Sequence, residues 1–380
     1  MRPERRAAVV GLSEGEISGM RDHAELLAQA LAQEGVSCTV HWLAREQRSL
    51  AGARAETGSW ARGLREQLER ERPDAILFHY SPFAYSYRGV PLLLSSTLAA
   101  LRGSRAPVVT FMHECAYSWR TGGWRGKLWA LTQRAALIDV MRTSRAAVVT
   151  TDFRVQWLGT RRWLPRMALP LAPVFSNLPA PSPEQRPERS NLIGLFGFAF
   201  PDASAAMVLD ALVLLRGRGI EARLLLLGAP GPASGAGEAW LAAARERDLA
   251  ALLSFTGRLP AQELSDALAR CDVLLSASLA GPSSRKGTLA ASLASGRPVL
   301  AVDGPRSWSE LLRHEALEIV EPTASALAGA LATTLADETL GDALGARGRA
   351  FAEDRMSLAH SASVVAALFE DLLSRPASPP

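Results

Sequence analysis

The first 150 residues of the chain alternate between short apolar runs and amphipathic stretches. The apolar runs lie at 6–12, 37–43, 75–80, 106–113 and 146–151. Helical spacing of the apolar residues marks 20–33, 60–71, 91–102 and 125–142. Buried strands that alternate with helices form parallel sheets covered on both faces. The pattern therefore predicts a Rossmann-like α/β unit.

The alternation is interrupted at 176–191, where four prolines and several charged residues stand without apolar periodicity. This composition is typical of a linker. The alternation then restarts, with apolar runs at 191–198, 221–229, 252–257, 272–278, 297–302 and 316–322. Helical patterns separate and follow them at 203–217, 237–250, 260–270, 287–295, 307–313, 323–336, 338–353 and 357–373. The second part of the chain is predicted to be another Rossmann-like unit.

We therefore expect a Rossmann-like domain at 1–178, a linker at 179–190, a second Rossmann-like domain at 191–356 and a last helix at 357–374. In open α/β sheets, ligands bind outside the carboxyl ends of the strands. Two such domains joined by a linker predict a fold in which both face one cleft, and we expect the ligand there.

Composition supports a folded protein rather than a disordered one. Of the 380 residues, 48% are hydrophobic, and the mean hydropathy is +0.06, which is enough apolar material for buried cores. The net charge is only +4, although the isoelectric point is about 9.3. This balance permits an anionic ligand or lipid surface without requiring one.

The cysteines and the N-terminus favour a cytoplasmic protein. Cys38, Cys115 and Cys271 are far apart and form no CxxC pair, so neither a disulfide framework nor cysteine-bound metal is expected. The N-terminal apolar run AAVVGL is too short for a signal peptide and is predicted to be the first strand. No window is expected to approach the roughly 18 apolar residues of a membrane span.

The stretch GPSSRKGTLAASLASGRPVL at 281–300 places charge at the start of a helix. Ser284, Arg285, Lys286, Gly287 and Thr288 follow one another where the helical pattern begins. A helix N-terminus presents unpaired N–H groups and about half a positive charge, to which two cationic side chains are added here. The combination suits a diphosphate. The alternative interpretation is a solvated basic loop that caps an ordinary helix.

Longer segments carry a family resemblance. One segment, at 252–278, has in order a strand, Gly, a turn, Glu-Leu, a helix, Asp-Val and a second strand, with the sequence LLSFTGRLPAQELSDALARCDVLLSAS. TLAASLASGRPVLAVDGPRSWSEL at 288–311 carries Gly-Arg-Pro-Val before a strand and Glu310 at a helix. In this order, over about 191–321, they resemble retaining GT-B glycosyltransferases of family 4 (group 1). The resemblance implies a last helix that returns to the N-terminal domain.

The first half resembles the same family more weakly, through GMRDH at 19–23 and VVTFMHE at 108–114. The resemblance implies that His113 and Glu114, at the end of a strand, face the donor sugar or the acceptor. His79 ends the preceding strand and is a further candidate, while Gly15 and Gly19 would let the N-terminal loop approach a ligand. A structural histidine and flexible turns are the alternatives. His23 is expected to be a surface or packing residue, and His41 a structural one.

The sequence departs from the family at its donor site. The family's Glu-x7-Glu pair falls at about Ser283 and Ala291, so both carboxylates are missing. The Arg and Lys that follow the first strand of the second domain are also missing from GLFGFAFPDAS. We interpret Arg285 and Lys286 as supplying that charge from a different loop.

The resemblance implies sugar transfer from a nucleotide-sugar, with retention. Catalytic roles fall to His113, Arg285 and Lys286, and donor-binding roles to Ser284, Gly287, Thr288, Arg258, Leu259 and Glu310. Arg258 and Leu259 are expected near the base, and Glu310 near ribose or sugar hydroxyls unless it only complements the helix dipole. No Asp-x-Asp motif occurs, and neither a metal nor a cofactor is expected beyond the nucleotide-sugar co-substrate.

Tryptophan and basic residues are interleaved at 117–134, and the first domain is the acceptor side by resemblance. Such mixing serves acceptor docking or peripheral contact with the inner membrane face, or else consists of core Trp with solvated Arg. The weak net charge argues against nucleic acid. The alternatives to a transferase are a GT-B-shaped sugar-nucleotide epimerase and a weakened binding or partner protein. A dehydrogenase is disfavoured because neither half opens with G-x-G-x-x-G.

Overall fold

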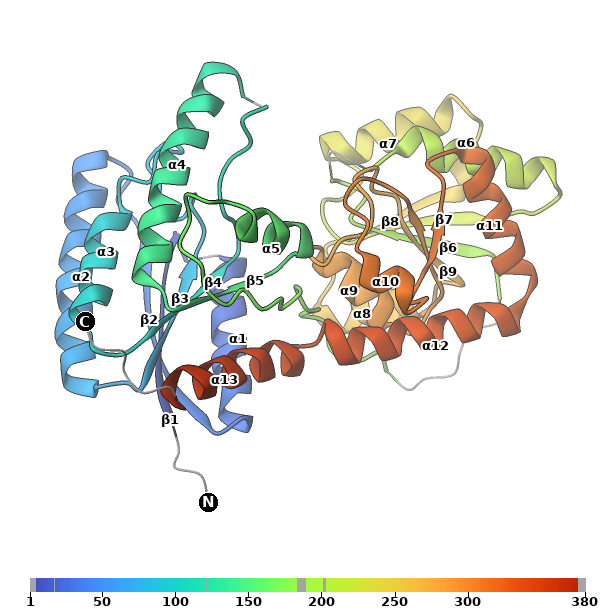
Figure 1. Cartoon of the computed structure of the whole chain (residues 1–380). Coiled ribbons are helices and arrows are strands. Elements are labelled where there is room, and N and C mark those ends of the chain that lie inside the picture. Colours follow the sequence, from blue (N-terminus) through green and yellow to red (C-terminus); the bar gives the residue numbers. More distant parts are fainter. Residues whose placement is uncertain (1–4, 17, 121, 183–188, 201–202, 375–380) are drawn as a thin grey trace. The chain divides into compact units, whose positions relative to one another are not determined.

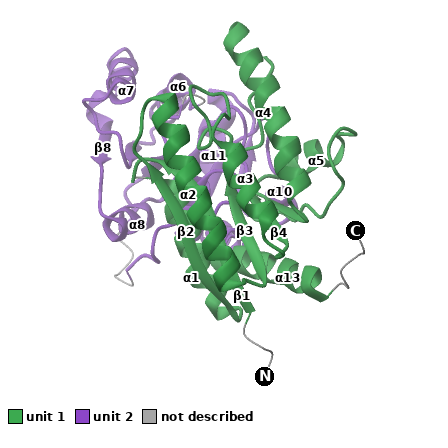
Figure 2. Ribbon diagram, turned by 90° about the vertical axis from the view of Figure 1, so that its left-hand side faces the viewer, with its two compact units in different colours: residues 1–172, 358–380 green, residues 173–357 purple. Residues whose placement is uncertain are grey.

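The structure is a computed structural model that describes residues 5–16, 18–120, 122–182, 189–200 and 203–374. The chain forms two compact units, shown in different colours in Figure 2. Unit 1 is Met1–Ala172 together with Leu358–Pro380, and unit 2 is Pro173–Ser357. Of the linker expected at 179–190, residues 183–188 lie outside the described residues.

Unit 1 is built on a parallel sheet with the strand order β2-β1-β3-β4-β5 (Figure 1). Its strands are β1 (Arg5–Glu14), β2 (Val36–Arg45), β3 (Ala75–Tyr80), β4 (Val108–Met112) and β5 (Ala146–Val149). Every residue of β3, β4 and β5 is buried, because helices cover both faces of these strands.

The helices of unit 1 are α1 (Gly19–Gln33), α2 (Leu50–Glu71), α3 (Leu94–Gly103), α4 (Gly123–Thr143), α5 (Asp152–Gly159) and α13 (Leu358–Ser374). One core holds residues of α2, α3 and α4 against the sheet. The other places Leu27 and Leu31 of α1 with Val365 and Phe369 of α13. The last helix therefore completes the core of unit 1, although unit 2 precedes it in the chain.

Unit 2 has a parallel sheet with the order β11-β10-β9-β6-β7-β8. Its strands are β6 (Leu192–Phe196), β7 (Arg223–Leu227), β8 (Leu253–Gly257), β9 (Val273–Ser276), β10 (Val299–Val302) and β11 (Glu318–Val320). Its helices are α6 (Ala205–Gly217), α7 (Gly235–Arg245), α8 (Ala261–Ala269), α9 (Gly287–Ala294), α10 (Ser309–Arg313), α11 (Ala324–Ala336) and α12 (Glu338–Arg355). The two sheets confirm the predicted pair of Rossmann-like α/β units.

Each sheet has a point at which the strand order reverses. In unit 1 the first strand, β1, lies between β2 and β3; in unit 2 the first strand, β6, lies between β7 and β9. At such a point the successive connections leave on opposite faces of the sheet and open a crevice outside the carboxyl ends of the strands. We call these positions the switch points of the two units.

Two helices differ from the sequence-based expectation. The helix α2 begins at Leu50, ten residues before the predicted start at 60, and the Ser49 side chain caps it by accepting the Gly52 N–H at 3.1 Å. The glycines at 52 and 58 weaken the helical pattern but do not end the helix. The short helix α5 was not predicted, and its buried residues are limited to Leu158.

The C-terminal helices α12 and α13 correct a further expectation. Within Glu338–Ser374, one 18-residue window has a mean hydropathy of 1.3 and is apolar enough for a membrane span. The helix is interrupted at Met356 and Ser357, however, and its apolar residues include Val365 and Phe369 of the unit 1 core. We interpret the window as part of two core helices.

Candidate functional site

The predicted Arg-Lys segment lies at the switch point of unit 2. A small pocket of about 10 Å³ opens between the carboxyl ends of β6 and β9. Phe196 and Gly197 line it from β6, and Ser276 and Ser278 line it from β9. Lys286 and Thr288 complete the wall at the start of α9. The structure thus brings two of the predicted donor-site residues to the place where an α/β sheet binds ligands.

The start of α9 presents backbone donors to this pocket. Lys286 occupies the N-cap, and its side chain has no oxygen that could accept the N–H groups of the first turn. Its Nζ lies 5.1 Å from the centroid of the Phe200 ring. Ser284 is fully buried, and its carbonyl accepts the Val174 N–H at 2.8 Å, which fixes the preceding loop. Arg285 is exposed beside it.

Gly197 allows the end of β6 to pass close to α9. Its φ is +94°, which a side chain rarely permits, and a Cβ at this position would lie 2.7 Å from the Phe200 ring and 3.4 Å from Thr288 Cγ2. Because Gly197 has no side chain, the backbone after β6 can lie directly against the start of α9.

The other predicted donor-site residues lie elsewhere in unit 2. Arg258 and Leu259 follow β8, an edge strand separated from β6 by β7. Glu310, in the first turn of α10, pairs with Arg313 and lies 3.5 Å from His314 Nε2, so its carboxylate already has partners on its own helix. At the positions of the missing family carboxylates, Ser283 and Ala291 are both buried.

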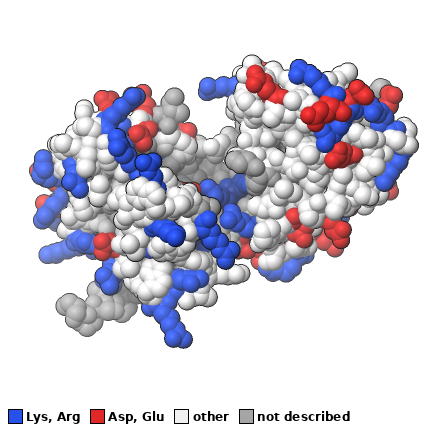
Figure 3. Space-filling view, turned by 90° about the horizontal axis from the view of Figure 1, so that it is seen from above, with Lys and Arg blue, Asp and Glu red and all other residues white. Residues whose placement is uncertain are grey.

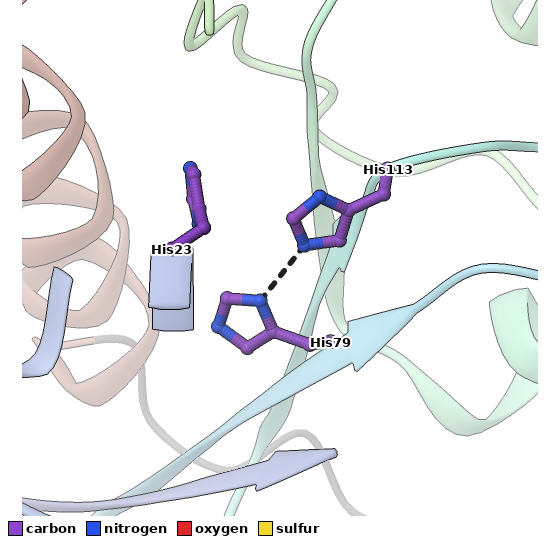
Figure 4. Close-up of side chains that lie close together, drawn as sticks. All are labelled: His23, His79 and His113. Carbon is purple, nitrogen blue, oxygen red and sulfur yellow. Dashed lines mark hydrogen bonds between the residues drawn. The ribbon is translucent and has the colours of Figure 1, made fainter. Parts of the chain in front are cut away.

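The carboxyl edge of unit 1 brings three histidines together (Figure 4). His79 lies near the end of β3, His113 directly follows β4, and His23 is in the second turn of α1. His79 Nδ1 lies 2.9 Å from His113 Nε2. The ring centroid of His23 lies 5.8 Å from that of His79 and 5.0 Å from that of His113. We refer to these residues as the histidine cluster.

Burial keeps the histidine cluster neutral at physiological pH. It lowers the pKa of His23 to about 4. Burial, and secondly the nearby His23, hold the pKa of His79 well below the ordinary 6.5. The pKa of His113 is lowered mainly by burial and further by His23, His79 and Arg154. A charged imidazole would lose its hydration here, so each ring offers a lone pair instead of a second proton.

The remaining predicted residues of unit 1 lie around the same edge. Glu114 follows His113 and is half-buried. Gly15 follows β1 with a φ of +74°, and its N–H donates to the Arg45 carbonyl at 2.9 Å. Gly19 is the first residue of α1. The structure therefore places His79, His113, Glu114, Gly15 and Gly19 near the carboxyl ends of β1, β3 and β4.

Sequence reasoning missed two residues of these sites. His23 was expected at the surface or in packing, and its 7% exposure agrees with packing, but its membership of the histidine cluster was not predicted. Its place in the second turn of the helix after β1, the switch-point strand, is the signal that could have found it. Phe200 was not predicted, although it follows β6 by only four residues.

The 117–134 segment presents apolar side chains to solvent along α4; residue 121 lies outside the described residues. Trp124 is 72% exposed and Leu131 is 59% exposed. Beside them lies a groove of about 620 Å³, lined by Phe83, Arg88, Gly89, Val90, Trp124, Arg125, Leu128 and Trp129. We call it the α4 groove.

Part of the aromatic-basic interleaving is structural. The Arg134 guanidinium lies over the Trp119 ring at 4.6 Å and over the Trp157 ring at 5.7 Å. Its Nη1 also donates to the Tyr117 carbonyl at 2.9 Å. Arg134 therefore holds the loop before α4 against the helix, whereas Trp124 remains at the surface.

The second half of unit 1 is strongly basic. Between residues 81 and 172 the sequence has 13 Lys and Arg residues but only three acidic residues, Glu114, Asp139 and Asp152. Figure 3 shows many Lys and Arg and fewer Asp and Glu side chains on the surface of unit 1, and both signs of charge on unit 2. The modest net charge of the whole chain conceals this local excess.

Comparison with known proteins identifies the fold. No family model and no curated protein sequence matches the chain. A glycosyltransferase from Rickettsia africae superimposes with a TM-score of 0.70 and 15% identity, covering 98% of this chain and 100% of that one. Anabaena HepE, solved with UDP and glucose, gives 0.68 and 15%, covering 96% and 99%.

A third structure, sucrose-phosphate synthase from Thermosynechococcus elongatus, gives a TM-score of 0.67 and 15% identity, with 97% of this chain and 99% of that chain covered. The similarity therefore extends over nearly the whole of each chain. The two parallel-sheet α/β units have the GT-B fold of these glycosyltransferases.

Proposed function

We propose that this protein is a glycosyltransferase that moves a sugar from a nucleotide-sugar to an acceptor. The observation that carries the proposal is the position of Lys286 and Thr288 at the switch point of unit 2, where α9 begins. The solved GT-B structures with which the chain aligns support it, since HepE was solved with UDP and glucose.

The chemistry rests on charge at the helix start. When the sugar leaves its donor, negative charge develops on the departing diphosphate. Prealigned N–H groups of α9 and the charges of Arg285 and Lys286 stabilise that charge without reorganising. This arrangement supplies the charge that a metal supplies in other transferases. The departing phosphate accepts the acceptor proton, and the sugar is transferred with retention of configuration.

Unit 1 is assigned to the acceptor. His113 and Glu114 lie at its carboxyl edge, where they bind the sugar or the acceptor hydroxyl, and Gly15 and Gly19 allow close approach of the ligand. His79 is fully buried and therefore supports His113 through their 2.9 Å ring contact instead of touching the ligand itself. The α4 groove offers apolar and aromatic walls for the rest of an acceptor such as a glycan or a lipid-linked sugar.

Titration with UDP-, GDP- and dTDP-sugars tests the donor assignment. One donor should bind wild-type protein, and the Arg285→Ala/Lys286→Ala variant should bind its diphosphate product at least about tenfold more weakly, because charge-assisted hydrogen bonds are lost. Arg223→Ala is the matched control, since Arg223 is exposed at the opposite, amino end of β7. Unchanged binding in the double variant would remove the phosphate assignment.

The missing carboxylate pair favours a second candidate, a weakened GT-B protein that binds a donor or partner without turnover. Ser283 and Ala291 cannot replace the contacts that two glutamates make to sugar and ribose hydroxyls. Mass spectrometry of a nucleotide-sugar panel separates the candidates. Free diphosphate and a transferred or hydrolysed sugar indicate an enzyme, an altered sugar still on its nucleotide indicates an epimerase, and binding alone indicates a partner protein.

We also propose that the protein is cytoplasmic and contacts an anionic membrane face through α4. Trp124, Leu128 and Leu131 are exposed on this helix beside Arg125 and Lys127. An apolar stripe flanked by cationic residues inserts shallowly among lipids while the charges remain with the head groups. Such contact would bring a lipid-linked acceptor to the α4 groove.

A further inference from the structure

The histidine cluster lies at the switch point of unit 1, in the position that corresponds to the pocket of unit 2. The strand β3 carries His79 next to β1, β4 is followed by His113, and α1 carries His23 directly after β1. These residues are far apart in sequence, and three separate elements must converge to bring them together (Figure 4). Their convergence is therefore a property of the fold and not of a local turn.

The cluster has the dimensions of a small-ion site. One nitrogen from each of His23, His79 and His113 lies within 4.8 Å of the other two. Three nitrogens around a tetrahedral zinc ion, each about 2.0–2.1 Å from it, are separated by about 3.3 Å. Small rotations of the imidazole rings close this difference.

The packing leaves hydrogen-bonding capacity unused in the cluster. His79 is fully buried, and within the described residues its Nε2 has no hydrogen-bond partner. Whichever tautomer His79 adopts, Nδ1 is engaged with His113 and Nε2 stays unsatisfied. Buried polar atoms are almost always paired, so an unpaired imidazole nitrogen at a switch point indicates that a partner is missing.

The surroundings hold the three rings in place. The Phe111 ring stacks on His79 with centroids 5.3 Å apart and contacts His23 at 4.8 Å. Arg154 Nη1 donates to the His113 carbonyl at 2.6 Å, which fixes the backbone of that residue. Apolar walls and a fixed backbone limit the imidazoles to small adjustments, so that ligand geometry can select a metal.

We propose that the histidine cluster binds one zinc-class divalent cation through one nitrogen each of His23, His79 and His113. Three imidazoles and no carboxylate among them favour Zn²⁺, Co²⁺ or Ni²⁺ over Mg²⁺ and Ca²⁺, which prefer oxygen ligands. The half-buried His113 marks the side from which a water or a ligand oxygen reaches the fourth position. The ion joins the start of α1 to the ends of β3 and β4 and positions His113 at the acceptor edge.

The full-length protein, freed of any affinity tag and stripped with a chelator, is titrated with Zn²⁺ and Co²⁺. We expect one equivalent of either metal per chain. Bound Co²⁺ should show the visible absorption of four-coordinate cobalt without a thiolate charge-transfer band, since no cysteine is among the ligands. Zn²⁺ should also raise the melting temperature, and the rise should continue with the free Zn²⁺ concentration beyond saturation of the site.

Two variants assign the ligands. His113→Gln, at the half-buried position, should weaken Zn²⁺ binding at least about tenfold while circular dichroism remains that of wild type. His314→Gln removes a histidine beside Glu310 in unit 2 and should leave one equivalent bound. If His113→Gln does not fold, protection of the wild-type cluster from histidine acylation by Zn²⁺ decides instead.

Absence of binding at micromolar Zn²⁺, a thiolate charge-transfer band, or a stoichiometry that falls only in His314→Gln would each overturn the proposal. The result is independent of the donor assignment in unit 2, because metal content and the cobalt spectrum are measured without any nucleotide-sugar. If the protein binds UDP but no zinc, the zinc-site proposal is wrong and the proposed glycosyltransferase function is unaffected.

Discussion

Single residues determine how closely the elements of this protein approach, and glycines show this most directly. A Cβ at Gly89 would lie 2.3 Å from the Trp129 ring, and the φ of Gly89 is +85°. The Gly89 carbonyl also accepts a hydrogen bond from Gln133 Nε2 at 3.0 Å. One wall of the α4 groove therefore depends on the absence of a side chain at this position.

Gly89→Ala should destabilise unit 1 by about 1–3 kcal/mol, because the added methyl group overlaps the Trp129 ring in a strained backbone conformation. Chemical denaturation followed by tryptophan fluorescence measures the change. Gly63→Ala is the matched control, since no atom lies within 4 Å of its Cβ position and the residue is inside α2. That variant should be stabilised by about 0.5–1 kcal/mol.

The titration of the buried histidines predicts a pH dependence. The unfolded chain binds protons on His23, His79 and His113 near pH 6.5, but the folded chain does not, because burial lowers each pKa. Stability is therefore constant above this pH and falls below it, by up to about 1.4 kcal/mol per pH unit for each histidine. Denaturation in chelator from pH 7.5 to roughly 5 checks this.

In the same series, the unfolding free energy of His23→Gln should change less steeply with pH, because the unfolded variant takes up one proton fewer than wild type. An unfolding free energy that stays flat between pH 6.5 and the pKa of about 4 for His23 would contradict the assignment of these groups as buried and neutral.

At the scale of elements, the consecutive helices α12 and α13 pack in different units. Phe351 on α12 lies against Trp308 in unit 2, with ring centroids 5.4 Å apart. Phe369 on α13 belongs to the core that contains Leu27 and Leu31 of α1. The two phenylalanines are similarly buried, so they form a matched pair that reports on the two cores separately.

Phe369→Ala should cost unit 1 about 3–5 kcal/mol, because it leaves a cavity between α1 and α13. Phe351→Ala should cost unit 2 a similar amount. Hydrogen exchange by mass spectrometry resolves which unit opens. Faster exchange in β6–β10 upon Phe369→Ala would show that α13 does not belong to the unit 1 core.

The strand β3 could be predicted from the sequence, whereas the start of the helix α2 could not. The run 75–80 matches β3 residue for residue, because a strand buried on both faces is mostly apolar, with His79 as the polar exception. The start of α2 could not be found in the same way, since Gly52 and Gly58 look like turn residues until packing overrides their propensity.

The histidine cluster could be predicted from the sequence only in part. The strand-end positions of His79 and His113 predicted a shared edge. Neither their ring contact nor the contribution of His23 from α1 was visible without coordinates, because side-chain direction depends on how α1 packs on the sheet.

At the scale of the whole molecule, the basic residues of 81–172 and the exposed face of α4 belong to the same unit. In the proposed membrane contact, long-range attraction and shallow insertion would therefore act together at an anionic surface. Unit 2 has 17 Lys and Arg residues against 21 Asp and Glu residues, and we expect it to contribute little to the proposed membrane contact.

Trp124→Ser/Leu131→Ser should reduce binding to phosphatidylglycerol vesicles at least about tenfold, because two apolar side chains no longer enter the lipid. Cosedimentation measures this, and salt should weaken the wild-type binding. Leu214→Ser/Leu312→Ser, at exposed leucines of unit 2, should bind like wild type. The proposed lipid contact of α4 would be wrong if wild type and both double variants bound equally. It would also be wrong if wild type bound phosphatidylcholine as well as phosphatidylglycerol vesicles.

The core that α13 completes has a consequence for synthesis on the ribosome. The apolar face of α1, with Leu27 and Leu31, emerges more than 300 residues before the helix that covers it. Unit 2 is continuous and can finish folding first, whereas the nascent unit 1 must wait with an uncovered surface. A chaperone that shields α1 during translation would act in this interval, and its need would end when α13 leaves the exit tunnel.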